Sequence, residues 1–468
     1  MSAANIVARK LFISTTVILV NFNVTLNSSL PSGAGATLWR HFGVTSEAQK
    51  TLPVAIFLVG YIFGPLVFAP LSEYWGRRPV LLCSFAVHTA FTLGCALAPS
   101  WGVFLYFRFM LGCAAAAPQT VSGGLFADIY PELGPRGVAV TMLGLTSNVG
   151  PLLGPIISGF TSTEVWQWQF WCVLILAAGN WPLLLLLPET FPPVLRNRVR
   201  CAATAENATA SLHVAHRSVP RTAVVPFLRE QARLLARPIW MLSEPLVFFT
   251  DLFILYQYAI FFLYFGVYSI IFRGTYGMSD GMTALMFIPT GLGGVISIFI
   301  FIAWDRFYEF SVASGKSWAL QTLEYRRLPL ACLGGPLFAM SQFWLGWTAR
   351  PTIHWAVPAS SGVFLGIGID LTFLALNNYL TDTYDIYSAS ALASSVFTRN
   401  VLAAVLIPLT TYPLYKDLGT AWGSTTLGCI SLVLLPIPFV FIRYGAAIRS
   451  RSPLCQKLER MNNSAGSG

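Results

Sequence analysis

The sequence predicts an all-α membrane protein with twelve transmembrane helices in two pseudo-symmetric six-helix bundles. The first observation is composition. Of 468 residues, 55% are hydrophobic and only 10% are charged, whereas about 25% are charged in an ordinary soluble domain. The second is a series of apolar segments close to the roughly 20 residues that span a bilayer as a helix. The third is one long polar interval, 188–243, that separates the first six segments from the last six.

The apolar segments follow one another at short intervals on both sides of this polar interval. Basic residues are spread over the short loops and form no stripe, so the net charge of +10 does not indicate a nucleic-acid partner. In chain order, the predicted spans cover residues 11–30, 51–71, 80–98, 101–124, 138–160, 168–187, 244–268, 281–303, 328–348, 354–380, 389–412 and 422–442.

The segments divide the chain into four parts. Residues 1–190 form the predicted first bundle, and residues 244–445 form the second. A cytoplasmic linker, 191–243, joins them, and a cytoplasmic tail, 446–468, follows. Within the linker, 227-FLREQARLLARP-238 has the pattern of an amphipathic helix that lies on a membrane surface.

The distribution of basic residues predicts the orientation of the spans. Cytoplasmic loops of membrane proteins carry an excess of lysine and arginine. If the N-terminus is cytoplasmic, most of the 29 lysines and arginines fall in cytoplasmic segments. The exceptions are Arg40, Lys50, Arg108, Arg273, Arg350, Arg399 and Lys416. Both termini are therefore expected in the cytoplasm.

Four local patterns stand at particular places in the first half: after span two, in span four, in span five and after span six. They are 64-GPLVFAPLSEYWGRRPVLL-82, 108-RFMLGCAAAAPQTVSGGLFADIY-130, 144-GLTSNVGPLLGPIISGF-160 and 188-PETFPPVLRNR-198. With 244-EPLVFF-249 and the stretch 377–400, they resemble the major facilitator superfamily, and specifically its twelve-spanning drug:proton antiporter family as found in fungi. The resemblance covers nearly the whole chain.

The loop pattern after span two combines an acid with two arginines in a tight turn. Glu73 precedes Arg77 and Arg78, and charged bonds to neighbouring helix ends must break if two bundles rock against each other. The resemblance implies a conformational latch, with Asp128 and Arg136 as partners. The alternative is ordinary topology signalling by positive charge.

The pattern in span five places helix breakers inside an apolar segment. Small residues let helices approach closely, and membrane helices tolerate proline where neighbours satisfy the freed carbonyls. We expect a kinked, tightly packed span that seals one half against the other; a general packing seam is the alternative. The resemblance implies that these residues form an antiporter motif, and from this follows the expectation that the protein exchanges its substrate instead of taking it up. Its residues are Gly150, Pro151, Gly154, Pro155 and Gly159.

Arg108 lies about two turns into an apolar span, where an arginine is costly. The resemblance implies that this position faces the central cavity and couples transport to protons or substrate. Gln119 lies three turns further along, on the same helix face. The alternative is an arginine that extends to the outer surface of the membrane.

Two acids also lie inside predicted spans, Asp251 in span seven and Asp370 in span ten. Tyr258 and Asn377 each follow one of them by seven residues, on the same face. The resemblance implies that spans one, four, seven and ten line the cavity. Because burial disfavours the charged form of a carboxylate, both acids are proton-carrier candidates. The alternatives are a structural ion pair or a position near the cytoplasmic interface.

Polar and aromatic residues complete the predicted substrate cavity, which comprises Asn21, Gln119, Tyr258, Tyr268 and Asn377. Two departures from the family pattern stand out. Many members carry an acid late in span seven, where this chain has Gly266 in 265-FGVYS-269, so the proton route differs or coupling is absent. The loop after span eight keeps only a degenerate charged turn, 304-WDRFYE-309.

These features predict a proton-coupled exporter of small amphipathic molecules, such as drugs, toxins or secondary metabolites, working by alternating access. An uncoupled or importing carrier of polyamines, sugars or organic acids would share the fold, although 188-PETFP-192 differs from the P-E-S-P-R pattern of sugar carriers. A membrane enzyme is a distant alternative, since no HEXXH pattern is present. We expect a monomer in the plasma membrane whose partners are the substrate, protons and lipid, with no cofactor, metal or nucleic acid.

Overall fold

The computed structural model describes residues 3–130, 133–163, 165–192, 194–196, 240–315, 324–384, 388–452 and 454–456. Within these ranges the chain is helical and has no strand. Most of the predicted linker, including the amphipathic segment 227–238, lies outside the described residues, as does most of the tail. The linker and the four-part division therefore stay predictions.

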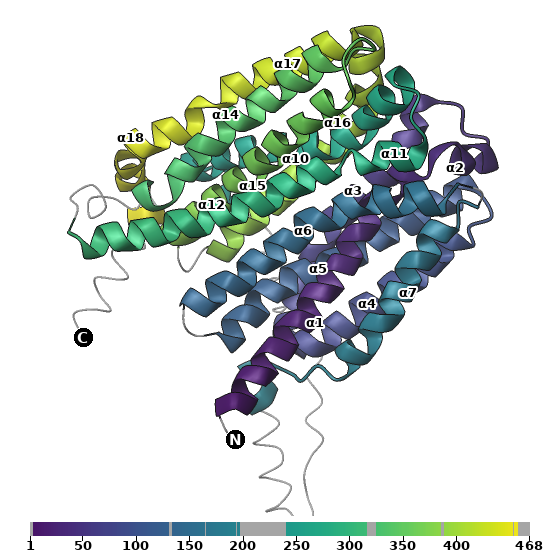
Figure 1. The fold of residues 1–468 in the computed structure, drawn as a ribbon. Coiled ribbons are helices and arrows are strands. Elements are labelled where there is room, and N and C mark those ends of the chain that lie inside the picture. The colour runs from purple at the N-terminus through teal and green to yellow at the C-terminus, as the bar shows by residue number, and fades with distance from the viewer. Residues whose placement is uncertain are drawn as a thin grey trace, which may run out of the picture.

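The first half of the chain forms six long helices and one short helix between the first two (Figure 1). Continuous apolar sequence is the reason for their length, because a helix satisfies all its backbone groups internally where water is absent. They are α1 (Ala3–Ser29), α2 (Gly35–Phe42), α3 (Glu47–Trp75), α4 (Arg77–Ala96), α5 (Trp101–Ile129), α6 (Leu133–Thr161) and α7 (Trp168–Leu185).

The second half repeats this arrangement with more interruptions. Four of its spans change helix type or break, and proline begins the second piece where α17 gives way to α18. The elements are α10 (Pro245–Tyr268) with η4 (Ser269–Thr275), α11 (Asp280–Leu285) with α12 (Ile288–Ala313), α14 (Glu324–Thr348), α15 (Ala356–Tyr384), α16 (Ser388–Tyr412) with η6 (Pro413–Asp417), and α17 (Gly419–Leu434) with α18 (Pro436–Arg451).

The predicted spans agree with these helices. Among the described residues, eleven helices are long and apolar enough to cross a membrane. The remaining predicted span, 51–71, lies within the 29-residue helix α3, which packs along α5. All twelve predicted segments are thus helical, and the all-α membrane fold is confirmed.

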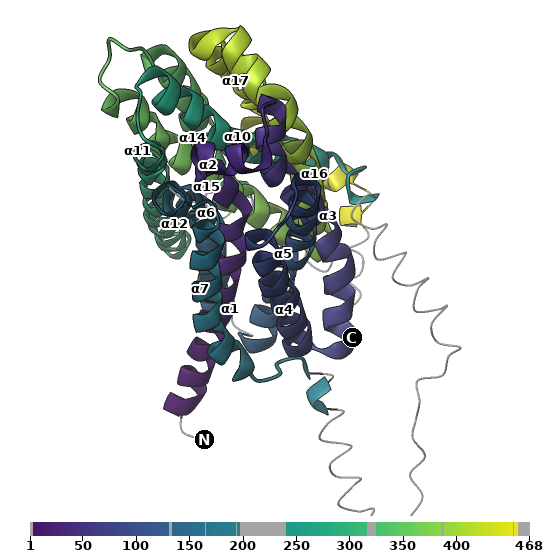
Figure 2. The ribbon, with the colours of Figure 1, turned by 90° about the vertical axis from the view of Figure 1, so that its right-hand side faces the viewer.

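The helices pair in the same order in both halves. In the first half α1 packs on α6, α3 and α4 pack on α5, and α4 packs on α7. In the second half α10 packs on α16, α12 and α14 pack on α15, and α14 packs on α17. Figures 1 and 2 show the result as two bundles side by side. The pairing confirms the pseudo-symmetry that the sequence predicts.

Glycines bring matching helix pairs into close contact in each bundle. A Cβ at Gly60 on α3 or Gly112 on α5 would strike the facing backbone. The same holds for Gly293 on α12 and Gly366 on α15, which is the corresponding pair in the second bundle. Without a hydrophobic driving force between helices in lipid, such close backbone packing is a main source of association.

The seam between α1 and α6 explains the glycines and prolines of span five. A Cβ at Gly150 would overlap Thr25 of α1, and one at Gly154 would overlap Ser29. Pro155 has no amide hydrogen for the carbonyl of Pro151, and Ser29 Oγ donates to that carbonyl at 2.5 Å instead. The neighbouring helix thus supplies the bond that proline removes.

Contact between the bundles is concentrated at the end of the molecule that carries α2 and α11, which we call the α2/α11 end. There α6 packs on α11 and α12, and α3 packs on α16. A Cβ at Gly159 would lie 2.9 Å from the carbonyl oxygen of Asp280 on α11. Contact between the halves therefore involves Gly159, whereas Gly150 and Gly154 pack α6 against α1 of the same bundle. Toward the opposite end, where α1 begins, the bundles diverge (Figure 1).

Replacing Gly154 by Ala is expected to lower the melting temperature of the purified protein in detergent, because the new methyl group overlaps Ser29 Oγ. Overpacking of this kind costs about 1–3 kcal/mol. Gly179→Ala on α7 is the matched control, since a Cβ there meets nothing within 4 Å. Equal melting temperatures for the two variants would contradict the packing seam.

Candidate functional site

A cavity lies between the two bundles and takes side chains from seven helices. Its volume is about 40 Å³, enough for a few water molecules. A cavity of this volume is too small for a drug-sized organic molecule. The lining is mostly apolar and aromatic and consists of Thr25, Ser28, Phe57, Leu58, Tyr61, Gln119, Ser147, Asn148, Pro151, Ile254, Gln257, Tyr258, Phe261, Phe262, Ile369, Phe373 and Arg399.

Two of the five predicted cavity residues, Gln119 and Tyr258, line this cavity. Gln119 accepts a hydrogen bond from the Tyr61 hydroxyl across the α3–α5 contact. Tyr258 donates to Asn400 Oδ1 at 3.2 Å. From the antiporter pattern, Pro151 also reaches the lining.

The other three predicted cavity residues lie elsewhere. Asn21 donates from Nδ2 to Ser147 Oγ at 3.0 Å and packs α1 on α6. Tyr268 is fully buried and stacks on Phe287, with ring centroids 4.6 Å apart. Asn377 is on α15 and is not part of the lining. Helical spacing predicted a polar face, but it did not show which part of that face meets the cavity.

Arg108 is fully buried behind the cavity wall and does not line it. Its Nε donates to the Pro53 carbonyl at 3.0 Å, and Nη2 donates to the Ser28 carbonyl at 2.8 Å. Nη1 donates to both oxygens of Asn27, at 2.8 and 3.2 Å. All three nitrogens are therefore bonded, and the side chain ties α5 to α1 and α3. It does not extend to the membrane surface.

Asp370 connects the two bundles. Its Oδ1 accepts a hydrogen bond from Asn148 Nδ2, which projects from α6 of the other bundle and lines the cavity. A Cβ at Gly294 would strike the second carboxylate oxygen, so glycine on α12 leaves the space that Asp370 occupies. A buried carboxylate thus sits at a contact that must change if the bundles move.

Asp251 is 1% exposed and lies within the second bundle. Ser394 Oγ of α16 donates to its Oδ2 at 2.8 Å, while Oδ1 has no donor among the described residues. Arg399, further along α16, interacts with this carboxylate electrostatically without forming an ion pair. An acid with one free oxygen in this position is able to take a proton.

Arg399 is the functional candidate that the sequence analysis did not single out. It lines the cavity, is 4% exposed, and lies over the rings of Tyr258 and Phe373, at 4.9 and 5.2 Å from their centroids. The available signal was the same as for Arg108, namely an arginine in the middle of an apolar segment.

The loop after α3 forms a charged network inside the first bundle. Arg77 Nε pairs with Asp128 Oδ2 at 3.2 Å. Arg136 reaches Asp128 only by longer-range electrostatics, and the side chain of Glu73 lies outside the described part of the structure. No bond of this network crosses between the bundles among the described residues, so a latch between the halves stays a prediction.

Glu189 completes this network, although the sequence analysis did not assign it. Its carboxylate accepts from the backbone amides of Arg77 and Arg78, at 2.9 and 3.2 Å, at the start of α4. A carboxylate at a helix N-terminus satisfies unpaired amides and interacts favourably with the helix dipole. Gly76, at φ +104°, brings the turn so close that a Cβ would strike Glu189.

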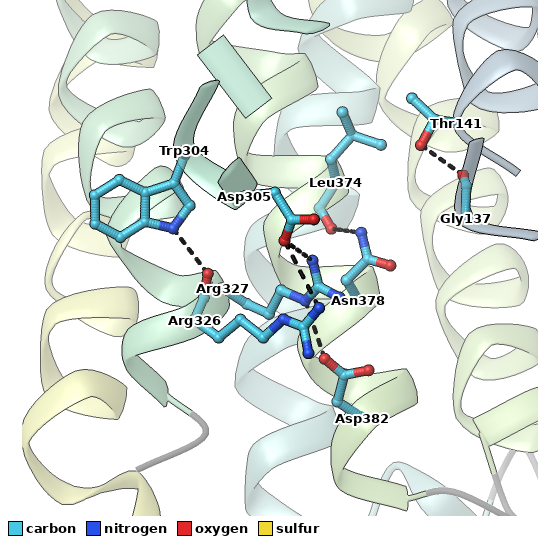
Figure 3. Close-up of polar contacts among 9 residues, drawn as sticks. All are labelled: Gly137, Thr141, Trp304, Asp305, Arg326, Arg327, Leu374, Asn378 and Asp382. Carbon is cyan, nitrogen blue, oxygen red and sulfur yellow. Dashed lines mark hydrogen bonds and ion pairs between the residues drawn. The ribbon is translucent and has the colours of Figure 1, made fainter. Parts of the chain in front are cut away.

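A second charged network occupies the corresponding place in the second bundle (Figure 3). Arg327 Nε pairs with Asp382 Oδ2 at 3.0 Å, and its Nη1 lies 3.4 Å from Asp305 Oδ1. Arg326 also approaches Asp305, at 3.8 Å. Residues 304–309 lie within helix α12, so the charged turn that the sequence suggested there was wrong. The basic partners of Asp305 come from α14.

Comparison with known proteins agrees with this architecture. The family model for the Major Facilitator Superfamily matches residues 17–408. The MFS transporter prlG of Fungal sp. is 36% identical over 450 residues, which cover 94% of this chain and 92% of that protein. The efflux pump FUB11 of Gibberella moniliformis is 34% identical, covering 91% of this chain and 71% of the pump.

Solved structures resemble the fold at low sequence identity. The crystal structure of a D-xylose-proton symporter has a TM-score of 0.65 at 16% identity, covering 91% of this chain and 97% of the symporter. A partially occluded inward open conformation of the xylose transporter XylE from E. coli has a TM-score of 0.62 at 16% identity, covering 93% and 98%. Together with the matched family model, these relatives show that the chain belongs to the major facilitator superfamily, a family of multi-pass membrane transporters and not of enzymes.

Proposed function

We propose that the protein exports small amphipathic molecules in exchange for protons, by alternating access around the central cavity. The observation that carries this proposal is the bond between Asn148 and Asp370. It joins the two bundles beside the cavity through a carboxylate that is able to bind a proton. A proton and a substrate can then act on the same contact.

The coupling follows from the chemistry of that contact. An ionised Asp370 accepts a charge-assisted hydrogen bond, which is stronger than a neutral one. Protonation weakens the bond, and a substrate in the cavity requires space between the same two bundles. Binding of either the proton or the substrate thus breaks the contact between Asn148 and Asp370. When neither is bound, the ionised carboxylate keeps the contact and the carrier stays in one conformation. This difference between states is what an exchanger needs, because a ligand shifts a conformational equilibrium only through differential affinity.

Orientation follows from the basic residues. The end where α1 begins lies in the cytoplasm in this proposal, because cytoplasmic loops carry the positive charge. The structure, with its bundles in contact at the α2/α11 end, is then an inward-facing form. Asp251, near the start of α10, serves as a second proton site that faces the cytoplasmic half. The carrier works as a monomer in the plasma membrane.

Export is favoured over uptake by the relatives. Two of them, from Gibberella moniliformis and Fusarium oxysporum, are named efflux pumps. The aromatic and apolar cavity lining suits amphipathic molecules, which bury an apolar body and keep a few polar contacts. The symporters among the similar structures support the fold alone, because their identity to this chain is low.

We assign Arg108 a positioning role in this proposal. Its guanidinium is saturated by oxygens of α1 and α3 and has no free nitrogen facing the cavity. Ser28, whose carbonyl it binds, lines the cavity. The arginine therefore fixes the cavity wall, and proton transfer falls to the acids.

Asp370→Asn is expected to reduce substrate-driven proton flux by at least about tenfold, because an amide side chain cannot bind and release a proton as a carboxylate does. Asp251→Asn should reduce it in the same direction. The measurement uses purified protein in liposomes that contain a pH-sensitive dye, with an imposed pH gradient and added amphipathic compounds. Asp417→Asn, an exposed acid on η6, is the control.

The outcome separates the alternatives. Full proton flux in both variants would contradict the assignment of the proton sites. Substrate movement without proton flux in the unmodified protein would favour the uncoupled carrier, in keeping with Gly266 where the family often has an acid. In that case the Asn148 contact would respond to substrate alone.

Arg108→Ala is expected to lower both the yield and the melting temperature, because buried carbonyls left without donors cost about 1–3 kcal/mol each. Arg108→Lys should retain part of this stability, with proton flux per folded molecule close to that of the unmodified protein. A lysine variant with an unchanged melting temperature and no proton flux would instead show that Arg108 takes part in coupling.

A further inference from the structure

The cavity contains a buried cation whose nitrogens have no partner. Arg399 is 4% exposed, and none of its nitrogens forms a hydrogen bond or an ion pair with a described residue. Arg108, the other buried arginine inside a span, has an oxygen for every nitrogen. The hydrogen-bond donors of Arg108, behind the cavity wall, are therefore all satisfied, whereas those of Arg399, in the cavity lining, are not.

Aromatic rings hold this guanidinium without satisfying it. Tyr258 of α10 and Phe373 of α15 each present a ring face, at 4.9 and 5.2 Å from the guanidinium carbon. Such contacts attract a cation and fix its position. They accept no hydrogen bond in the plane of the guanidinium, so the N–H groups remain available. Burial of a cation without an anionic partner is unfavourable, which leaves a preference for a ligand that brings one.

The charges around Arg399 do not fill this role. Among the lining residues Arg399 is the only one with a formal charge. Tyr61 and Tyr258 line the same cavity, and a tyrosine hydroxyl is neutral at pH 7. Asp251 interacts with it electrostatically, but that carboxylate is bonded to Ser394 and lies beyond ion-pair distance.

A second unused donor faces the same space. Gln257 on α10 lines the cavity, is 2% exposed, and its Nε2 has no acceptor among the described residues. Two buried side chains in one cavity thus present N–H groups without acceptors. A ligand rich in oxygen acceptors satisfies both, whereas a cationic ligand satisfies neither.

We propose that the substrates are organic anions, whose carboxylate or other acidic group binds Arg399 while an apolar body packs on the aromatic lining. A guanidinium presents its N–H groups as a fork that matches the two oxygens of a carboxylate. Phe261 and Phe262 supply the apolar surface. The inference rests on the proposed transport function and narrows its substrate class, and it argues against polyamines.

Matched compounds test the charge preference directly. We would measure binding to purified protein in detergent, without any gradient, by calorimetry and by the shift in melting temperature. The probes are 4-phenylbutyrate, decanoate and naphthalene-2-carboxylate, each with its neutral amide and its corresponding amine. At least one acid is expected to bind about tenfold or more tightly than its amide and its amine, the difference that a charge-assisted hydrogen bond gives.

Variants locate the binding group. Arg399→Gln should lose the preference for the acid over the amide, and Arg399→Lys should keep part of it. Arg350→Gln is the matched control, because Arg350 also lies over a ring, that of Trp347, but is exposed and outside the cavity. If Arg399→Gln does not fold, Phe373→Leu removes one supporting ring and should weaken acid binding several-fold.

The outcomes distinguish this inference from the proposed function. Binding of an acid that requires Arg399, without any proton-coupled movement of it in liposomes, would support the anion site and overturn the exchange. Proton-coupled export of amines or amides, with no acid bound, would overturn the anion site and leave the exchange intact. Failure of all three acids to bind at millimolar concentration would also overturn it.

Discussion

Inside a bilayer, a backbone or polar group without a partner in the protein is costly, and much of the described core follows from this constraint. The first helix shows it most clearly. Ser29 supplies the hydrogen that proline withholds from a carbonyl of α6, and Asn27 and Ser28 offer their carbonyls to Arg108. Water cannot substitute for these partners at that depth, so substitutions at the contacts of α1 are expected to be costly. Because α1 also forms part of the cavity wall, the same contacts fix the position of that wall.

Each bundle repeats the same physical devices in matching places. Glycine contacts join α3 to α5 and α12 to α15. An arginine at the start of α4 or α14 pairs with an aspartate at the end of α5 or α15, as Arg77 does with Asp128 and Arg327 with Asp382. These contacts lie within one bundle, so each bundle can move as a unit. Contacts between the bundles come from other residues, on α3 with α16 and on α6 with α11 and α12.

The sequence predicted the spans and the repeat, because these depend on apolar length, whereas the family resemblance alone pointed to Asp128 as a partner of Arg77. It did not predict what each polar side chain inside a span would meet. Asn377 and Tyr268 occupy a polar or aromatic face but lie away from the cavity. Arg108 and Arg399 look alike in sequence, and only the oxygens contributed by distant helices distinguish a structural arginine from an unpaired one. Such partners depend on tertiary packing, which helical spacing does not encode.

The cap that Glu189 places on α4 has a consequence for the segment that follows it. The chain leaves the first bundle at a point already fixed by amides of Arg77, Arg78, Thr190 and Phe191. The described segment after α7 is therefore held at Glu189 by four hydrogen bonds. One carboxylate thus ties the first turn of α4 to the chain that follows α7, so neither can shift without the other.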